Sequence, residues 1–281
     1  MTKSFSCNSC QKPQTRRRNR LLMVALLAVA AAVGVTGWRL YRAAQPMELA
    51  LYFHPFVGPE PLVFNDPRYP NPGGEGRFKV RAFQFFLSNI RLVSATGAYA
   101  ESDSYHLVRF DGAEFTSAKS ASVDRLPFVI VLHGVPRRSY ERIEFGIGVD
   151  AAANRSLAQR GDLDPNGRMA WNWEVGYKFV LLEGALLRGN GSEPLVYHVG
   201  FAENYRPIST RLRRELLDSR PARLDFRVDI LRLFRGSTNF DMAGLPSVKF
   251  DRADAALLGR NFAALVTPMW PEAAGQPERA P

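Results

Sequence analysis

The chain has 281 residues, of which 46% are hydrophobic and 11% are aromatic, so it can build a full core. This composition, with only two cysteines, excludes a wholly disordered chain and a small disulfide-stapled fold. The net charge of +10 is unevenly placed, because the first 46 residues hold eight Lys and Arg and no acidic residue. The rest of the chain carries 29 basic and 27 acidic side chains and is nearly neutral. A nucleic-acid partner is therefore not expected.

The N-terminal segment combines a basic cluster with an apolar run. Arginines stand at positions 16–18 and 20, and residues 21–38 contain no charge. A helix over this run would be about 27 Å long, close to the thickness of the hydrocarbon core of a bilayer. The positive-inside rule predicts 1–20 as a basic cytoplasmic tail, 21–38 as a single-pass transmembrane anchor in the inner membrane, and 39–46 as a linker to a periplasmic domain. A cleaved signal peptide, with the alanines at 30–32 as its cleavage site, is the alternative.

The body, residues 47–266, is dominated by short β-like runs. The clearest is 223–230, in which apolar residues alternate with charged ones, and residues 47–54 alternate in the same way. Helical periodicity appears only in pieces, at 209–217, 230–234 and 252–266. We therefore expect a mainly β fold, a single β-sandwich-like domain with a few short helices, followed by a flexible C-terminal tail at 267–281.

Common catalytic motifs are missing from the sequence. It contains no GxxxxGK[ST] phosphate loop, no GxSxG elbow, no HExxH zinc motif and no CxxCH haem site, which argues against an enzyme. Both cysteines, Cys7 and Cys10, lie in the basic tail. A soft metal bound by the body would need His, Met or an unusual ligand, because the body offers no thiolate.

Two short patterns within 162–173 point to a metal or to a turn. Asp162, Asp164 and Asn166, followed by a glycine, have the spacing that opens a calcium loop, but the twelfth position is a tryptophan instead of a glutamate. An Asx turn explains the same residues equally well. Trp171 and Trp173 are two positions apart, so on an extended segment they share a face, either in the core or beside a metal.

The segment around these patterns resembles a known family. The run Phe145-Gly-Ile-Gly-Val-Asp150, the Gly-Asp-Leu-Asp-Pro at 161–165, the Met-x-Trp-x-Trp-x-x-Gly-Tyr-x-Phe at 169–179 and the Glu-Gly at 183–184 are similar to the signature of the MbnP-like copper-binding proteins. These are exported proteins associated with methanobactin systems. The Phe-Phe-Leu-Ser-Asn-Ile at 85–90 and the Tyr-His-Val-Gly at 197–200 agree with this family. The resemblance covers roughly residues 47–266.

The resemblance implies copper handling outside the cytoplasm. In related proteins a di-haem cytochrome c peroxidase-like partner (MbnH-like) oxidises a tryptophan to kynurenine, which joins histidines around Cu(I). Carried over by motif, the copper ligands expected here are Trp171 or Trp173 with His54 and His198. The chain departs from the kynurenine-x-histidine arrangement of the related secreted copper proteins of methanotrophs, because the residue two after Trp171 is again a tryptophan. The alternative is a non-catalytic structural or interaction domain of the same fold without copper, with calcium at the turn that begins at Asp162.

Overall fold

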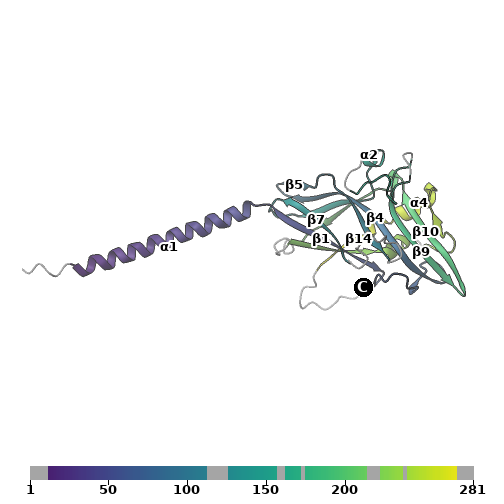
Figure 1. Ribbon diagram of the computed structural model, residues 1–281, viewed down its shortest axis with the longest axis horizontal. Coiled ribbons are helices and arrows are strands. Elements are labelled where there is room, and N and C mark those ends of the chain that lie inside the picture. The colour runs from purple at the N-terminus through teal and green to yellow at the C-terminus, as the bar shows by residue number, and fades with distance from the viewer. Residues whose placement is uncertain are drawn as a thin grey trace, which may run out of the picture. The chain divides into compact units, whose positions relative to one another are not determined.

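The computed structural model describes residues 12–112, 126–156, 162–171, 175–213, 222–236 and 239–270. The chain forms two compact units, Met1–Met47 and Glu48–Pro281. In the first unit, α1 (Lys12–Ala44) is one continuous helix (Figure 1). The transmembrane span predicted over 21–38 is not confirmed, because no helix within the described residues is long and apolar enough to cross a membrane.

The second unit is built mainly from strands, which form two curled sheets among its described residues (Figure 1). The larger sheet has nine strands in the order β11-β8-β4-β9-β10-β13, with β3, β5 and β6 also paired to β4. Its strands are β3 (Tyr69–Pro70), β4 (Arg77–Ser94), β5 (Gly97–Ala100), β6 (Tyr105–Asp111), β8 (Arg142–Ile147), β9 (Lys178–Arg188), β10 (Gly191–Gly200), β11 (Arg206–Arg211) and β13 (Ser247–Val248).

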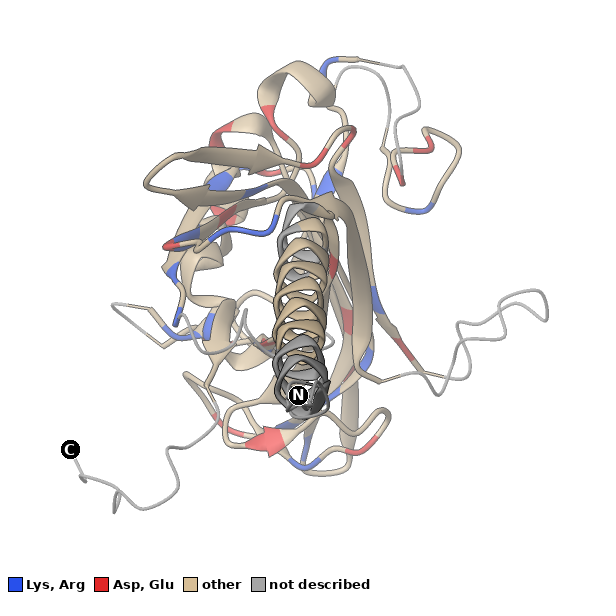
Figure 2. Ribbon diagram, turned by 90° about the vertical axis from the view of Figure 1, so that its left-hand side faces the viewer, with Lys and Arg blue, Asp and Glu red and all other residues tan. Residues whose placement is uncertain are grey.

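The smaller sheet has five strands in the order β14-β12-β1-β2, with β7 also paired to β1. Its strands are β1 (Met47–Val57), β2 (Glu60–Pro61), β7 (Phe128–Val135), β12 (Ala222–Asp229) and β14 (Val266–Met269). The helices of this unit are short: α2 (Ala151–Asn154), η2 (Ala202–Asn204), η3 (Ile230–Phe234), α4 (Arg252–Gly259) and η4 (Phe262–Ala264). The prediction of a mainly β fold with a few short helices is confirmed. Figure 2 shows Lys and Arg interspersed with Asp and Glu over this unit.

The smaller sheet is centred on a parallel pair of strands. β1 and β12 run side by side, with Leu49 opposite Ala222 and Phe56 opposite Asp229. The strand predicted from alternation at 223–230 is confirmed one residue earlier, and its apolar residues are buried. It ends where the Asp229 carboxylate accepts the N–H of Leu231 at 3.1 Å, because this bond caps the short helix η3.

Aromatic side chains join the two sheets. Phe145 of β8 packs edge-on against Phe226 of β12, with ring centroids 5.8 Å apart. Phe226 also stacks on Phe53 of β1 at 5.3 Å. Each buried aromatic ring removes about 150–250 Å² from water, so such contacts contribute strongly to the stability of the fold.

One predicted helix begins as a strand. Residues 206–211 form β11, paired antiparallel to β8, so the helix expected at 209–217 is wrong for residues 209–211. The helical pattern there was weak, and pairing with a neighbouring strand overrides weak local propensity. Residues 214–217 lie outside the described part of the chain. The helical segment predicted at 230–234 is confirmed with the same bounds as the 3-10 helix η3, and the one predicted at 252–266 is confirmed in shorter form as α4.

Asp150, from the segment that resembles a family signature, connects α2 to the larger sheet. Its carboxylate accepts the N–H groups of Ala152 and Ala153 at 3.0 and 3.2 Å, which caps the helix. It also accepts the hydroxyl of Tyr105 at 2.6 Å and the amide of Asn89 at 3.1 Å. Burial alone would raise the pKa of Asp150, but these hydrogen bonds together lower it. This carboxylate therefore has a structural role.

Asn154 and Gly176 fix the chain before β9. Oδ1 of Asn154 accepts the N–H of Tyr177 at 2.9 Å. Gly176 has φ +86°, and a Cβ there would collide with the side chain of Asn154, so only glycine fits. Together with the bridge between Ala170 and Tyr177, these contacts hold the loop at 162–171 beside β9.

Candidate functional site

The antiparallel strands β9 and β10 bring His198 and Glu183 together on the larger sheet. His198 lies opposite Leu181, and Glu183 lies opposite Val196, so the two polar side chains are diagonal neighbours on one face. Nε2 of His198 is 3.1 Å from Oε1 of Glu183, and the two side chains are only 15% and 21% exposed. Nδ1 of His198 has no hydrogen-bond partner among the described residues.

Glu183 is shared between His198 and a loop arginine. Nη2 of Arg168 lies 2.6 Å from Oε2 of Glu183. The hydrogen bond with His198, followed by the charge and hydrogen bond of Arg168, outweighs burial and lowers the pKa of Glu183 to about 2. Glu183 is therefore ionised at neutral pH, and a carboxylate in this position orients the imidazole and makes it more basic toward a ligand.

Lys178 ties the loop to the first residue of β9. Its ammonium donates to the carbonyl oxygen of Arg168 at 2.6 Å, and its backbone N–H donates to the carbonyl oxygen of Met169 at 2.7 Å. Burial lowers the pKa of Lys178, and the positive charge of Arg168 lowers it further. These contacts position the segment that ends at Trp171.

Trp171 lies between two phenylalanine rings. Its ring centroid is 5.5 Å from that of Phe201 and 5.2 Å from that of Phe250. The indole is half-buried, whereas Phe250 is 62% exposed. The exposed ring of Phe250 therefore separates part of the Trp171 indole from solvent. Trp173 lies outside the described residues.

The indole of Trp171 reaches β10 at Gly200. A Cβ added to Gly200 would lie 2.7 Å from Cζ3 and 3.2 Å from Cη2 of the indole. Gly200 is two residues beyond His198 on the same strand, after an irregularity in the pairing at Val199. The fold thus brings Trp171 to the part of β10 that carries His198.

Phe201 has an uncommon backbone conformation, with φ 69° and ψ 132°. This region is nearly restricted to glycine, and a non-glycine residue there costs about 1–3 kcal/mol. Its ring is held from both sides, by Trp171 and by the guanidinium of Arg252, which lies 4.4 Å from the ring centroid. Arg252 in turn pairs with Glu203 at 2.5 Å. Strain of this kind is concentrated at functional sites.

The structure places His54 on β1 of the smaller sheet, not on the strand pair that carries His198. Nε2 of His54 is 2.7 Å from Oδ1 of Asp225, and both side chains are 27% exposed. Asp225 also accepts two hydrogen bonds from Arg223, at 2.6 and 2.7 Å. Burial would raise the pKa of Asp225, but the hydrogen bonds from Arg223 and His54 lower it.

All four histidines of the chain pair with a carboxylate. Besides the two pairs above, His106 lies 2.7 Å from Glu101, and His133 lies 3.0 Å from Glu48. The His133 side chain is 73% exposed, whereas that of His198 is the most buried of the four. Within the described residues, no group of three or more His, Cys, Asp or Glu side chains is arranged to hold a metal ion.

The segment at 162–167 forms an Asx turn. Oδ1 of Asp164 accepts the N–H of Asn166 at 2.9 Å, and the backbone carbonyl of Asp164 accepts the N–H of Gly167 at 2.9 Å. Oδ2 of Asp162 accepts the N–H of Leu107 at 2.6 Å, which anchors the loop to β6. Backbone contacts thus account for both carboxylates, and a calcium ion at this turn stays a prediction.

A family model described as MbnP matches residues 46–250. The chain belongs to the MbnP family. MbnP from Methylosinus trichosporium has a similar structure, with a TM-score of 0.52 and 18% sequence identity over 73% of this chain and 83% of that chain. At this identity, the likeness is evidence for the fold alone. A comparison with curated protein sequences gave no match.

Membership in the MbnP family confirms the resemblance found in the signature segment and suggests a methanobactin-related, copper-associated function. The sequence reasoning missed four residues of the candidate site in this MbnP-family chain, namely Arg168, Glu183, Phe201 and Phe250. Glu183 stands beside Gly184 in the signature segment, which was a usable signal. Phe250 had none, because it lies almost 80 positions from Trp171 and only folding brings the two rings together.

Proposed function

We propose that this MbnP-family protein binds Cu(I) through His198 and an oxidised Trp171, and that it acts as a carrier or store and not as an enzyme. The observation that supports the proposal most directly is the position of the Trp171 indole on Gly200, two residues from His198. The ligand chemistry agrees with it, because imidazole suits copper and the body of the chain contains no cysteine.

His198 has the hydrogen bonding of a metal-ligating histidine. Such residues usually present one ring nitrogen to the metal and hold the other against a carboxylate. Here Nε2 contacts Glu183, and Nδ1 has no partner among the described residues. Arg168 neutralises the carboxylate and keeps it in place. We therefore assign Nδ1 of His198 as the copper-binding atom.

Trp171 would supply a second ligand after oxidation by a di-haem cytochrome c peroxidase-like protein (MbnH-like). Addition of two oxygen atoms across C2 and C3 of the indole opens the pyrrole ring, with two equivalents of hydrogen peroxide reduced to water. Hydrolysis then releases formate and leaves kynurenine, whose aniline nitrogen and ketone can bind copper. The indole of Trp171 contacts the exposed ring of Phe250, so it lies close to the surface. This position would let the haem partner withdraw electrons from the indole.

His54 is the ligand for which the fold gives least support, because it stands on the other sheet and is held by Asp225. The proposal therefore rests on His198. A third ligand would come from a residue outside the described part of the chain, such as Trp173, or from solvent. The proposed location, a periplasmic domain with an N-terminal inner-membrane segment, rests on the basic cluster at 16–20 and the apolar run at 21–38.

Copper titration tests the ligand assignment. With Cu(I) in competition with a chelator, we expect about one Cu(I) per oxidised chain, binding at least tenfold weaker in His198→Ala, and unchanged binding in His54→Ala. The exposed His133→Ala is the matched control, since it also removes a carboxylate-paired imidazole. Full-strength binding in His198→Ala would refute the assignment.

Mass spectrometry of the peptide that contains both tryptophans tests the modification. After expression with the di-haem partner, we expect kynurenine or N-formylkynurenine in the wild type and in Trp173→Phe, and neither product in Trp171→Phe. Modification that survives in Trp171→Phe and disappears in Trp173→Phe would move the ligand to Trp173. An unmodified wild-type peptide would contradict the proposed oxidation.

The alternative function is a structural or interaction module of the same fold without copper. It is favoured by one observation, namely that every histidine already has a carboxylate partner. Calcium at the Asp162–Asp164–Asn166 turn belongs to this alternative. It predicts no stoichiometric copper binding with or without the haem partner, and a thermal midpoint that rises with Ca²⁺ in the wild type but not in Asp164→Ala.

A further inference from the structure

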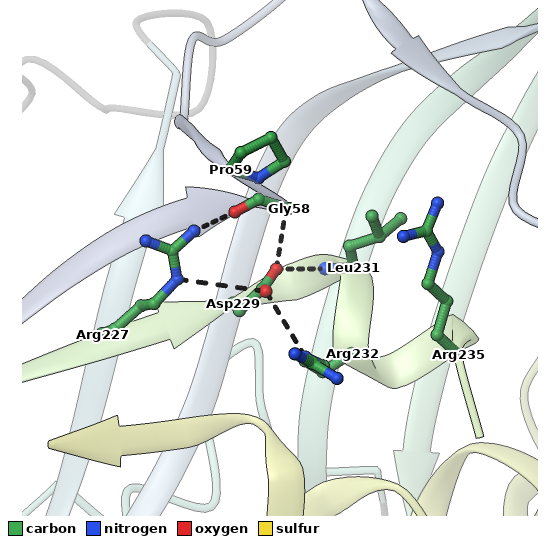
Figure 3. A pocket seen from close by; sticks show the side chains of 7 residues that line it. All are labelled: Gly58, Pro59, Arg227, Asp229, Leu231, Arg232 and Arg235. Atoms are coloured by element: carbon green, nitrogen blue, oxygen red, sulfur yellow. Dashed lines mark hydrogen bonds and ion pairs between the residues drawn. The ribbon is translucent and has the colours of Figure 1, made fainter. Parts of the chain in front are cut away.

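A cavity lined by three arginines lies on the smaller sheet, away from the strand pair of His198. It has a volume of about 360 Å³, and it is lined by Gly58, Pro59, Arg227, Asp229, Leu231, Arg232 and Arg235 (Figure 3). These residues come from the turn after β1, the end of β12 and the helix η3 with the residue that follows it. The volume is within the lower range of small-ligand pockets, which begins at about 300 Å³.

The charge of this cavity is strongly positive. Three guanidinium groups face one carboxylate, and that carboxylate is already committed. Oδ1 of Asp229 accepts the N–H of Gly58 at 2.8 Å and of Leu231 at 3.1 Å. Oδ2 lies 3.6 Å from Nε of Arg232 and 4.0 Å from Nε of Arg227. The lining therefore keeps a formal excess of two positive charges that Asp229 does not neutralise.

Two of the three arginines are held in place without a ligand. The guanidinium of Arg227 stacks on Phe56, 3.7 Å from the ring centroid, and donates to the carbonyl oxygen of Gly58. Arg232 is oriented by Asp229. Arg235 makes no hydrogen bond or ion pair within the described part of the chain. In Figure 3, Arg227 and Arg232 lie on either side of Asp229, and Arg235 stands beyond Leu231.

We infer that this cavity is a binding site for a small oxyanion, a phosphate or a carboxylate. Guanidinium groups match the oxygens of such anions with pairs of parallel N–H donors, and charge-assisted bonds of this kind are about twice as strong as neutral ones. The cavity has room for a compact ligand, and its three arginines supply the positive charge that an anion requires. This site is independent of the proposed copper site.

Calorimetric titration of the full chain tests the inference, with sodium phosphate and, separately, sodium succinate added at an ionic strength kept constant with NaCl. We expect saturable one-to-one binding of at least one of the two anions, and the tighter of them identifies the ligand chemistry. In Arg232→Gln/Arg235→Gln the affinity should fall at least about tenfold, and in Arg235→Gln alone about threefold. Arg91→Gln, which removes an exposed arginine from the other sheet, should leave binding unchanged.

Arg235→Gln keeps the test valid if the double variant folds poorly, because Arg235 is exposed and without a partner in the described residues. No saturable binding of either anion by the wild type would overturn the inference. So would equal affinities in the wild type, Arg91→Gln and Arg235→Gln, because the anion would then bind elsewhere.

Discussion

The indole of Trp171 lies so close to Gly200 that a Cβ on the glycine would stand 2.7 Å from Cζ3. The same Cβ would also collide with the carbonyl oxygen of Tyr177. The contact joins the loop at 162–171 to β10, on which His198 stands two residues earlier. The contact therefore places Trp171 against the end of the strand on which His198 pairs with Glu183.

Replacing this glycine with alanine should disturb the site. Gly200→Ala is expected to lower the free energy of unfolding by about 1–3 kcal/mol, because the added methyl group overpacks a buried contact. Urea denaturation followed by circular dichroism measures the change. Gly191→Ala on the same strand is the matched control, since its nearest neighbour, the carbonyl oxygen of Arg188, would lie at an ordinary 3.4 Å. An equal loss in both variants would contradict close packing at Gly200.

The sequence predicted the mainly β fold because strands such as β1 and β12 bury one face and leave the other more exposed. The alternation at 223–230 follows directly from the burial of one face of β12. The parallel pairing of β1 with β12 was not predictable, because an alternating strand reads the same in parallel and antiparallel sheets. The last three residues of the short strand β11 were predicted as helix for a related reason, namely that its partner β8 lies about 60 to 70 positions away.

The candidate site was predictable only in part. His198 and Trp171 belong to local motifs, so a family resemblance could identify them. Their neighbours come from elsewhere in the chain: Glu183 reaches His198 through the register of two strands, and Phe250 reaches Trp171 from a separate loop. Such contacts depend on tertiary structure and leave no spacing signal. His54 is the opposite case. It stands at the end of the alternating run 47–54 and was a reasonable candidate from the sequence, but the fold places it on the other sheet.

The ion pair of Glu183 should make stability depend on pH. The pKa of Glu183 falls from 4.5 to about 2 on folding, so its contribution is fully present above about pH 4.5 and is lost as the pH falls through about 2. We expect Glu183→Gln to cost on the order of 2 kcal/mol near pH 6 and much less at pH 2. Urea titrations across this range measure the difference.

Glu193→Gln is the control for this experiment. It removes a carboxylate on β10 whose partner, Arg188, lies 3.3 Å away in an exposed pair. Exposed pairs contribute about 0–1 kcal/mol, so this variant should lose little at any pH. If the destabilisation of Glu183→Gln were the same at pH 2 and pH 6, the interaction with His198 and Arg168 would not be ionic.

At position 201, a glycine variant should be more stable than an alanine variant, which is the reverse of the usual order in a strand. Both Phe201→Ala and Phe201→Gly lose the ring that packs against Trp171, but only glycine relieves the conformation at φ 69°. Phe201→Gly should therefore be more stable than Phe201→Ala by about 1 kcal/mol. At Val199, two residues earlier in β10, alanine should be the more stable replacement by about 0.5–1 kcal/mol. Thermal unfolding of the four variants measures these differences. If alanine were the more stable replacement at both positions, the backbone of Phe201 would not be strained.

Asp150 should contribute more to the free energy of unfolding than an ordinary helix cap. Asp251 caps α4 through a single bond to the N–H of Asp254 at 2.9 Å, so Asp251→Ala should cost about 1 kcal/mol. Asp150→Ala loses the cap of α2 and also the hydrogen bonds from Tyr105 and Asn89, which should bring its cost to about 3 kcal/mol or more. Chemical denaturation of both variants at neutral pH compares them. Equal costs would show that the bonds from Tyr105 and Asn89 add nothing, and Asp150 would then be a local cap instead of a link between α2 and the larger sheet.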